Sequence, residues 1–545
     1  METEPVRISE ALRALGAAVQ SSGVSGAVWF KESSPRNLRS RDFLVPSGAL
    51  RKSFPDGEVP QDLVNKLMSL NSPGMPCIHN CLQNDAGLII QLDRPAVFQR
   101  VLTDISPYLK PVPLDLCSEH GTVILNCTPL HSCKSLNELK LSHLRAALVA
   151  DHLTEVLRLR GVRVHLIPEV HSQEIKSFLH QLRIFWPSVS DIPSFRETIS
   201  AFKTSLKESV HTDYKDTDHS EDTEQILFNM HLKSFVEEQN LAQQGYDPNL
   251  DAFLVNEEDL EQLAWVHKCV QETHEEAANC TILHVVSCEE EFHQQKLDLL
   301  WRILDPSAEG ITQKHLICGQ VKVLNPSSPI SCSQYFHIRK SQMQEASVMK
   351  YGESVQGNRW DEIITCLASA AVKFEMMSTA HRSQVTLDLE DSSITTKGTK
   401  SGAFVMYNCA RLATMFESYT SAVQKGLYPE FPRAAELNYS TLKEEGEWLL
   451  LFNYIMPFPE VLAQSATISL ASPGIRVTAN TEAICKFLVK LSMDFSSYYN
   501  RVHILGEPLP HLFGVMFPRL QLMRAIQSVL HSALSTLHIL PLNQI

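Results

Sequence analysis

The chain is 545 residues long, and 44% of its residues are hydrophobic. One hydrophobic core cannot serve a chain of this length, so we expect roughly two to four domains. No stretch approaches the roughly 20 apolar residues of a membrane span, and no basic-then-apolar leader is recognisable, which argues against a membrane protein. The 13 cysteines follow no regular spacing, which favours a reducing compartment and predicts a cytoplasmic protein.

The net charge of −14 comes almost entirely from one stretch. Between Glu208 and Glu261 there are fifteen acidic residues and only two basic ones, Lys215 and Lys233. The rest of the chain is close to neutral, so its basic clusters are free to face a phosphate backbone. We interpret residues 205–245 as an acidic insertion, which is either a solvated loop, disordered over residues 212–224, or a docking segment for a basic partner.

Residues 1–112 have the pattern of a small α/β domain. Apolar residues at helical spacing predict a helix from Ser9 to Val19. Further along, residues 86–92 predict a strand and residues 94–105 the helix that follows it. A basic loop between these elements is either a solvated loop or an RNA contact. The candidate RNA-contacting residues of this loop are Arg36, Arg39 and Arg41.

The central part of the chain, residues 113–365, contains a strand–helix–strand unit. Thr122 to Cys127 predicts the first strand, and Val162 to Leu166 predicts the second. Between them, apolar residues recur at helical spacing, with Ser142 as a candidate cap at the start and Gly161 as a candidate end. In open parallel sheets the N-terminus of such a helix points at a ligand crevice.

This unit resembles the nucleotide-binding start of arginyl-tRNA synthetases, a class I family whose helix begins Leu-His-x-Gly-His-Leu-Arg. Leu139, His143 and Arg145 match that signature, but Lys140 replaces its first histidine and Ser142 replaces its glycine. In the family, the histidines stabilise the phosphates of ATP and the glycine leaves room for adenine. The resemblance therefore implies a degenerate ATP signature at Lys140, Ser142 and His143, on a scaffold that has lost catalysis.

No other motif supplies replacement chemistry. The second ATP signature of the family, Lys-Met-Ser-Lys, has no convincing match between Ser333 and Tyr351, and no Walker loop, Gly-x-Gly-x-x-Gly or His-Glu-x-x-His motif is present. Two Cys/His arrangements, within Cys77–Cys81 and Cys280–Cys288, lack the second ligand pair of a structural zinc site. We therefore predict no catalytic residue, no cofactor and no metal.

The resemblance is strongest in residues 366–545, whose composition predicts helices. Ala370–Phe374 occupies the place of the Asp-Ala-Leu-Arg-Tyr box for which the DALR anticodon-binding domain is named. Ala403–Leu412 resembles the family's Val-x-Tyr-Ala-His-Ala-Arg-Ile, and Ser497–Gly506 resembles its Ser-Phe-Tyr-Asn-x-Cys-Arg-Val-Leu-Gly. A stripe of apolar residues predicts a last helix over Arg519–Leu540. We therefore expect an α/β plus all-α protein: a small N-terminal α/β additional domain, a degenerate class I Rossmann-like domain and a C-terminal DALR helical bundle.

Tyr407 and Arg411 lie one helical turn apart, so they share a face of the predicted helix. On such a face an aromatic ring can stack on an unpaired base while a guanidinium pairs with phosphate, as in the anticodon-binding helix of the family. The alternative is a core tyrosine beside a surface arginine. The other candidate tRNA-contacting residues of this domain are Asn408, Lys397, Lys400, Tyr498, Tyr499, Arg501 and His503.

Taken together, the motifs resemble the DALR anticodon-binding domain-containing proteins, which are non-synthetase relatives of arginyl-tRNA synthetase. This resemblance implies a non-catalytic adaptor that binds arginine tRNAs and recruits a tRNA 3-methylcytidine methyltransferase to the anticodon loop. Two alternatives remain open at this point. One is an active arginine–tRNA ligase with atypical ATP signatures, and the other is a protein scaffold that has lost RNA binding.

Overall fold

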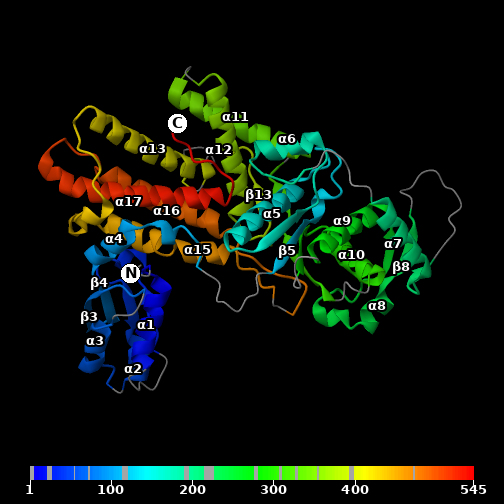
Figure 1. The fold of residues 1–545 in the computed structure, drawn as a ribbon, viewed down its shortest axis with the longest axis horizontal. Coiled ribbons are helices and arrows are strands. Elements are labelled where there is room, and N and C mark those ends of the chain that lie inside the picture. Colours follow the sequence, from blue (N-terminus) through cyan, green and yellow to red (C-terminus); the bar gives the residue numbers. More distant parts are fainter. Residues whose placement is uncertain are drawn as a thin grey trace.

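A computed structural model describes residues 5–20, 28–54, 56–70, 74–112, 121–188, 195–213, 226–274, 280–305, 310–325, 329–352, 355–391, 398–399, 401–470 and 473–544. An N-terminal α/β domain lies against a C-terminal bundle of helices (Figure 1). A parallel sheet with its covering helices lies beside that bundle, and a further α/β segment forms the far end of the molecule. This arrangement confirms the predicted fold class. None of the described helices is both long and apolar enough to cross a membrane.

The N-terminal domain is a four-stranded sheet, in the order β1-β2-β4-β3 with antiparallel pairing, covered by helices. Gly87 opens its last strand at φ 130°, and a Cβ there would lie 1.9 Å from the carbonyl oxygen of Val45, so only glycine fits. Its elements are α1 (Ile8–Gln20), β1 (Lys31–Glu32), β2 (Phe43–Pro46), α2 (Ser47–Ser53), α3 (Gln61–Met68), β3 (Ile78–Asn84), β4 (Gly87–Leu92) and α4 (Arg94–Thr103).

The central sheet is entirely parallel, in the order β11-β10-β5-β6, as the strand–helix–strand unit predicted. Its first helix ends at Leu159, and Gly161, just beyond the C-cap, has φ 79°. The prediction that Ser142 caps this helix was wrong, because the N-cap residue is Lys140. The elements are β5 (Thr122–Cys127), α5 (Leu141–Leu159), β6 (Arg163–Ile167), α6 (Gln173–Gln181), β10 (Cys280–Ser287), α10 (Glu291–Leu304) and β11 (Thr312–Cys318).

Much of the acidic insertion is folded. Its apolar residues, among them Leu206, Phe228 and Met230, join a second hydrophobic cluster that includes Ile124 and Ile282 of the central sheet. Residues 214–225, which include most of the segment predicted to be disordered, lie outside the described part of the chain. The described elements are α7 (Arg196–Glu208), β7 (Thr212–Asp213), β8 (Phe228–His231), α8 (Leu232–Glu238), β9 (Ala252–Val255) and α9 (Glu257–His274).

The C-terminal part is a helical bundle joined to the sheet by the short parallel pair β12–β13. The last helix begins earlier than predicted, because Pro510 occupies one of its first positions, where proline is tolerated. The elements are β12 (Val321–Val323), α11 (Cys332–Tyr351), α12 (Asn358–Met377), β13 (Val385–Leu387), α13 (Gly402–Gln424), α14 (Glu445–Leu450), continued by a π-helix (Leu451–Ile455), α15 (Phe458–Ser465), α16 (Ala483–Arg501) and α17 (Pro510–Ser535).

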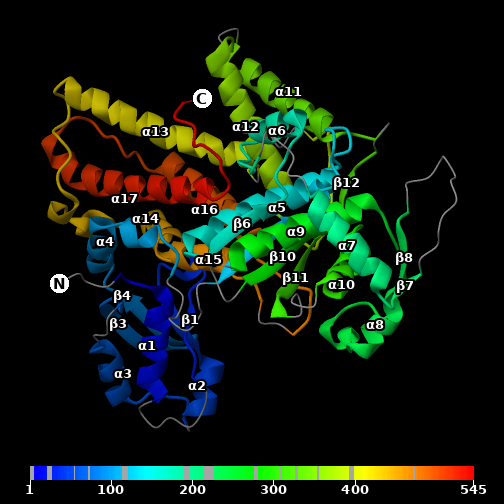
Figure 2. The ribbon, with the colours of Figure 1, turned by 45° about the vertical axis from the view of Figure 1, so that its right-hand side comes forward.

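A buried carboxylate joins the N-terminal domain to the bundle. Asp42, which is fully buried, accepts hydrogen bonds from the indole Nε1 of Trp448 at 2.8 Å, the backbone nitrogen of Leu92 at 2.7 Å and the guanidinium of Arg94 at 3.3 Å. Burial raises the pKa of Asp42, although the charge of Arg94 opposes that shift. These contacts place the N-terminal domain on the side of the bundle away from α11 and α13 (Figure 2).

Candidate nucleic-acid interface

The helix α13 presents one face to solvent because its other face packs closely on α12. A Cβ at Gly402 would lie 2.4 Å from the carbonyl oxygen of Ala370, so glycine permits this close approach. The hydroxyl of Ser401 caps the helix by accepting a hydrogen bond from the backbone nitrogen of Phe404 at 3.2 Å. Tyr407 and Arg411 consequently lie at the edge of the buried face, and each is half-buried.

The guanidinium of Arg411 lies between two aromatic rings. It is 4.6 Å from the ring centroid of Tyr499 on α16 and 5.4 Å from that of Tyr407. It also donates hydrogen bonds to Ser496 Oγ at 3.0 Å and to Asn500 Oδ1 at 2.6 Å. Both acceptors are neutral, and no carboxylate lies within ion-pairing distance of Arg411 among the residues that the structure describes. Its positive charge is therefore oriented but not neutralised.

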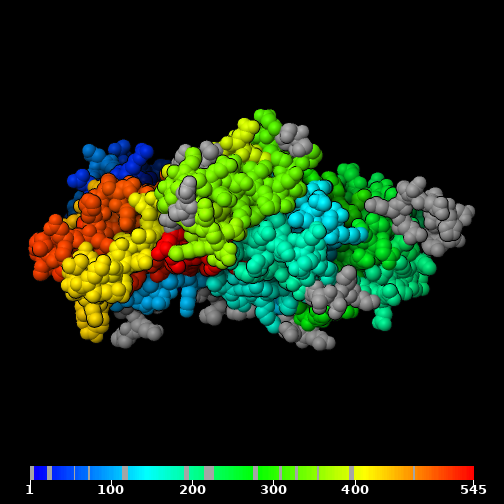
Figure 3. Space-filling view, turned by 90° about the horizontal axis from the view of Figure 1, so that it is seen from above, coloured from blue at the N-terminus to red at the C-terminus, as the bar shows by residue number. Residues whose placement is uncertain are grey.

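A second cation comes from α11, which sequence reasoning did not connect to this face. The ammonium of Lys350 lies 4.3 Å from the ring centroid of Tyr407 and 5.0 Å from that of Tyr351. Beside it, Met349 is 76% exposed. Figure 3 looks onto this face, where the yellow-green α11 region and the yellow α13 lie on either side of the red C-terminal segment. We call Lys350, Tyr407, Arg411 and Tyr499 the aromatic–cation cluster.

The other candidate residues of this domain differ in whether their side chains are buried or exposed. Tyr498 and Asn408 are buried, so neither side chain can reach RNA in this conformation. The hydroxyl of Tyr498 donates to Glu447 at 3.2 Å, while the amide of Asn408 donates to the backbone of its own helix. Arg501 and His503 are exposed at and just beyond the end of α16. The remaining two candidates, Lys397 and Lys400, lie outside the described residues.

The basic loop of the N-terminal domain is not brought to the aromatic–cation cluster. Arg36 and Arg39 are exposed and Arg41 is half-buried. The guanidinium of Arg39 lies 3.4 Å from the carboxylate of Glu445 on α14, so this arginine contributes to the contact between domains. Figures 1 and 2 place the loop's domain on the side of the bundle away from α11 and α13. Any RNA contact by the loop would therefore be a separate one.

Two residues of the degenerate ATP signature, Ser142 and His143, make contacts within the protein. The hydroxyl of Ser142 accepts a hydrogen bond from the backbone nitrogen of Val321 at 3.1 Å. Nε2 of the buried His143 lies 3.0 Å from a carboxylate oxygen of Glu290. A carboxylate in that position repels a phosphate, so the histidine's surroundings disfavour the ligand that it would stabilise in the family. Lys140 is exposed at the N-cap.

Neither predicted Cys/His arrangement forms a cluster of metal ligands. Cys77 is exposed while Cys81 is buried. His284 instead joins a buried group in which the donor atoms of His284, Asp298 and His315 all lie within 4.8 Å of one another. Nε2 of His315 lies 2.5 Å from the Asp298 carboxylate, a hydrogen-bonding distance. Burial lowers the pKa of His284 to about 4, so it remains neutral in this hydrogen-bonded network. The donor set could hold a metal only if the His315–Asp298 hydrogen bond opened.

Two segments of the chain match known domain families. Residues 6–108 match the DALR N-terminal domain, and residues 405–545 match the DALR anticodon binding domain. The fold is similar to that of Thermus thermophilus arginyl-tRNA synthetase over 98% of this chain and 100% of that one, with a TM-score of 0.61 and 15% identity. An arginyl-tRNA synthetase from Plasmodium falciparum gives a TM-score of 0.62 at 12% identity, over 99% and 100% of the two chains. The protein thus has the fold of arginyl-tRNA synthetases, with DALR domains at both ends.

More similar relatives define the family within this class. DALR anticodon-binding domain-containing protein 3 from Mus musculus is 45% identical over 560 residues, and the match covers 100% of both chains. The protein of the same name from Danio rerio is 43% identical over 569 residues, again covering 100% of both chains. The chain therefore belongs to the family of DALR anticodon-binding domain-containing protein 3, which confirms the family inferred from the motifs.

Proposed function

We propose that this protein is a tRNA-binding adaptor that grips the anticodon arm with its aromatic–cation cluster. The observation that supports this proposal most directly is the pair of cations, Arg411 and Lys350, that lie over tyrosine rings. In the described part of the chain, neither cation has a carboxylate within ion-pairing distance. Bases unstacked from a loop can stack on such rings, and the cations can pair with the adjoining phosphates. A solvated surface patch would not require cations from α11 and α13 to converge on one ring.

We further propose that the chain does not catalyse aminoacylation. The support is the chemistry around α5: a serine hydroxyl bonded to β12 replaces the glycine of the signature, and Glu290 lies against His143. Both changes oppose ATP binding, the first by filling space and the second by charge repulsion. The alternative, an active arginine–tRNA ligase, requires that these contacts rearrange.

The choice of partners rests on the family resemblance of the motifs. We propose that the bound RNAs are arginine tRNAs, and that the adaptor presents their anticodon loop to a 3-methylcytidine methyltransferase in the cytoplasm. The helical bundle would hold the tRNA, and the N-terminal domain, fixed to the bundle through Asp42 and Trp448, would extend the grip. The methyltransferase would supply the S-adenosylmethionine chemistry.

The test uses the purified full-length chain and labelled arginine tRNA. We expect binding that weakens steeply with salt, because phosphate contacts release counterions. An isolated anticodon stem-loop should compete, whereas a minihelix containing only the acceptor stem should not. Absence of tRNA binding would favour the protein-scaffold alternative and overturn the proposal.

The enzymatic part is measured separately. Arginine-dependent exchange between ATP and pyrophosphate should stay at background level with the same preparation. Exchange above background would establish the ligase alternative. Adding the methyltransferase should give 3-methylcytidine in arginine tRNA only when this chain is present, and methylation without it would remove the adaptor role.

A further inference from the structure

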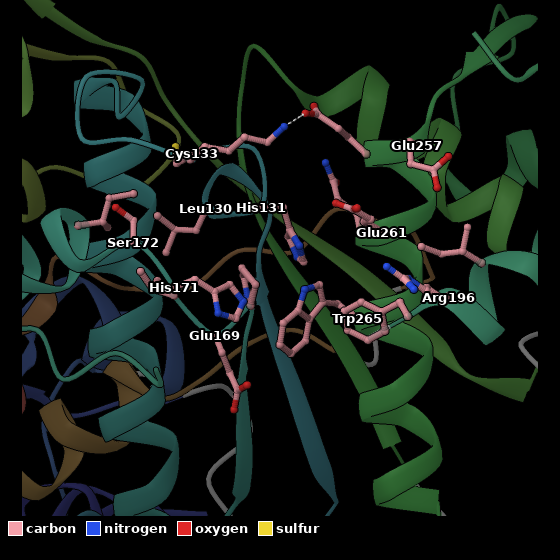
Figure 4. Close-up of a pocket in the computed structure, with 18 of the residues that line it drawn as sticks. Leu130, His131, Cys133, Glu169, His171, Ser172, Arg196, Glu257, Glu261 and Trp265 are labelled. Carbon is pink, nitrogen blue, oxygen red and sulfur yellow. Dashed lines mark hydrogen bonds and ion pairs between the residues drawn. The ribbon is translucent and has the colours of Figure 1, made fainter. Parts of the chain in front are cut away.

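A cavity lies between the central parallel sheet and the helices α7 and α9. It has a volume of about 1180 Å³ and opens between the segment that follows β6 and the first turns of α7 and α9 (Figure 4). The loop after β5 forms its floor. This volume exceeds the roughly 300–1,000 Å³ of small-molecule sites, so the cavity can take a short stretch of peptide.

Carboxylates from two elements face this cavity. Glu257, Glu258 and Glu261 come from the start of α9, and Glu169 comes from the segment after β6, across the cavity (Figure 4). The positive end of the α9 dipole accounts for acidic residues in its first turn, but not for Glu169 on the other wall. The carboxylates therefore lie on two walls of the cavity, and not only at the start of one helix.

The cavity already accepts ammonium groups from its own walls. Lys203 Nζ lies 2.6 Å from a carboxylate oxygen of Glu257, and Lys134 forms an ion pair with Glu258. Among the described residues, no such partner lies within ion-pairing distance of Glu169 or Glu261. Partial burial and the charges of Glu257 and Glu258 raise the pKa of Glu261, against the opposing effect of Lys134, so an added cation would relieve repulsion there.

Aromatic rings form the inner wall between these carboxylates. The indole of Trp265 packs edge-on against Phe195 with a centroid distance of 5.0 Å, and its ring centroid lies 6.0 Å from that of His171. The ammonium of Lys268 lies 5.8 Å from the Trp265 ring, so the indole accepts a cation at one position. Both ring nitrogens of His171 are inaccessible and find no hydrogen-bond partner among the described residues.

We propose that this cavity binds a lysine- or arginine-rich segment of a protein partner. The unpaired carboxylates Glu169 and Glu261 would form ion pairs with its side chains, and Trp265 would contact one of them through its ring face. Arg196 is the one basic side chain of the described lining that forms no ion pair there. An RNA 3′ end or a nucleotide is a poorer occupant, because its phosphates would meet the unpaired carboxylates of Glu169 and Glu261, and Arg196 offsets only one of these charges. This inference goes beyond the proposed function, since the cavity shares no residue with the aromatic–cation cluster.

The test measures binding of a labelled peptide of about ten residues, with alternating arginine and serine, to the full-length chain at low salt. We expect a Kd on the order of micromolar that weakens as salt rises. Glu169→Gln combined with Glu261→Gln should weaken binding about tenfold or more, and Trp265→Phe about two- to fivefold. A peptide with glutamate in place of arginine should not bind.

The matched control removes two charges from the acidic insertion, at residues that do not line the cavity. Glu237 and Glu238 are exposed on α8 and do not line it. The double variant Glu237→Gln, Glu238→Gln should bind the peptide within about twofold of the unchanged protein if the cavity is the site.

The proposal would be overturned by absence of peptide binding, or by equal weakening from the cavity pair and the α8 pair. Displacement of the peptide by ATP or by a short RNA ending in CCA would do the same, and would assign the cavity to a nucleotide ligand. Circular dichroism checks the fold, and Glu169→Gln alone replaces the double variant if that variant is unstable. Affinity for tRNA, measured on the same variants, should not change, so this proposal and the proposed function can fail independently.

Discussion

Two arginines from recognised motifs, Arg145 on α5 and Arg411 on α13, have opposite environments. Arg145 is fully buried and donates to backbone carbonyl oxygens, including those of Gly319 at 2.9 Å and Ala380 at 3.0 Å. Arg411 is half-buried and shares its charge between two tyrosine rings and two neutral acceptors. A buried guanidinium whose N–H groups all donate to backbone carbonyl groups stabilises the fold. A guanidinium at the surface whose charge is not neutralised can bind an anion.

The same contrast distinguishes the two regions that contain these arginines. Around α5 the signature residues have turned inward to partners within the chain, such as Val321 for Ser142 and Glu290 for His143. On α11, α13 and α16 the cations remain available. The proposed loss of ATP binding and the proposed tRNA binding both follow from how these side chains are paired, and four predictions test that difference.

The largest effect is expected at Arg145. The change Arg145→Ala leaves several buried carbonyl oxygens without donors, each costing roughly 1–3 kcal/mol, so we expect unfolding free energy to fall by about 3–5 kcal/mol. Chemical denaturation measures this loss. Affinity of the folded fraction for tRNA should stay unchanged. A stable variant with weakened tRNA binding would reverse the assignment of roles.

The next effect concerns Arg411. The change Arg411→Ala should weaken tRNA binding by about 1–3 kcal/mol with little change in stability. The matched control is Arg433→Ala, because Arg433 is an exposed arginine of the same bundle that is paired with Glu436. Fluorescence anisotropy with labelled tRNA measures both variants. Equal affinities for the two variants would remove Arg411 from the interface.

The third prediction concerns a pH-dependent contact between His538, near the end of the chain, and α5. It tests whether α5 has a structural role. Burial opposes protonation of His538, but hydrogen bonds and charges from Asp151 and Glu155 on α5 outweigh it and raise the pKa of His538 to about 9. The stabilisation of the fold by protonated His538 is therefore complete below about pH 6.5 and is lost as the pH rises through about 9. We expect a loss of up to about 3 kcal/mol over that range, which is what a rise of this size in the pKa supplies. His538→Gln, followed by thermal unfolding across pH, should remove this dependence, and an unchanged profile would contradict it.

The smallest effect is expected at Lys350, the cation that comes from outside the anticodon-binding helices. The change Lys350→Ala should weaken tRNA binding by about 0.5–1 kcal/mol, because the ammonium is exposed to solvent and salt. Lys486→Ala is a suitable control, since Lys486 on α16 is already paired with Glu482. If Lys350 acts with Arg411, the double variant should lose more affinity than either single change.

Much of the architecture could be predicted because it follows from local patterns. The apolar run of residues 122–127 and the helical spacing after Leu141 defined the parallel unit, and Gly161 ended the helix as expected. The folded part of the acidic insertion could not be predicted in the same way. Its core residues, such as Leu206, Met230 and Leu241, are widely spaced in the chain and become one cluster only when they pack on the central sheet.

The candidate interface was only partly predictable for a related reason. Helical spacing places Tyr407 and Arg411 on one face, but spacing alone does not tell which of the adjacent Tyr498 and Tyr499 is buried. That depends on Gly446, whose missing side chain leaves room for the Tyr498 ring. Nothing in the sequence indicated Lys350, because no pattern in α11 predicts that the last turn of this helix lies beside α13.

The sequence by itself determined the order of the domains, the family and the erosion of the ATP signature, because these depend on which residues occur at which spacing. Only the tertiary structure decided which motif residues are consumed by internal partners and which still face solvent. The physical reason is that a side chain's charge is available to a ligand only where packing has not already neutralised or enclosed it. That condition depends on neighbours such as Glu290, Lys350 and Tyr499, which lie far from the motifs along the chain.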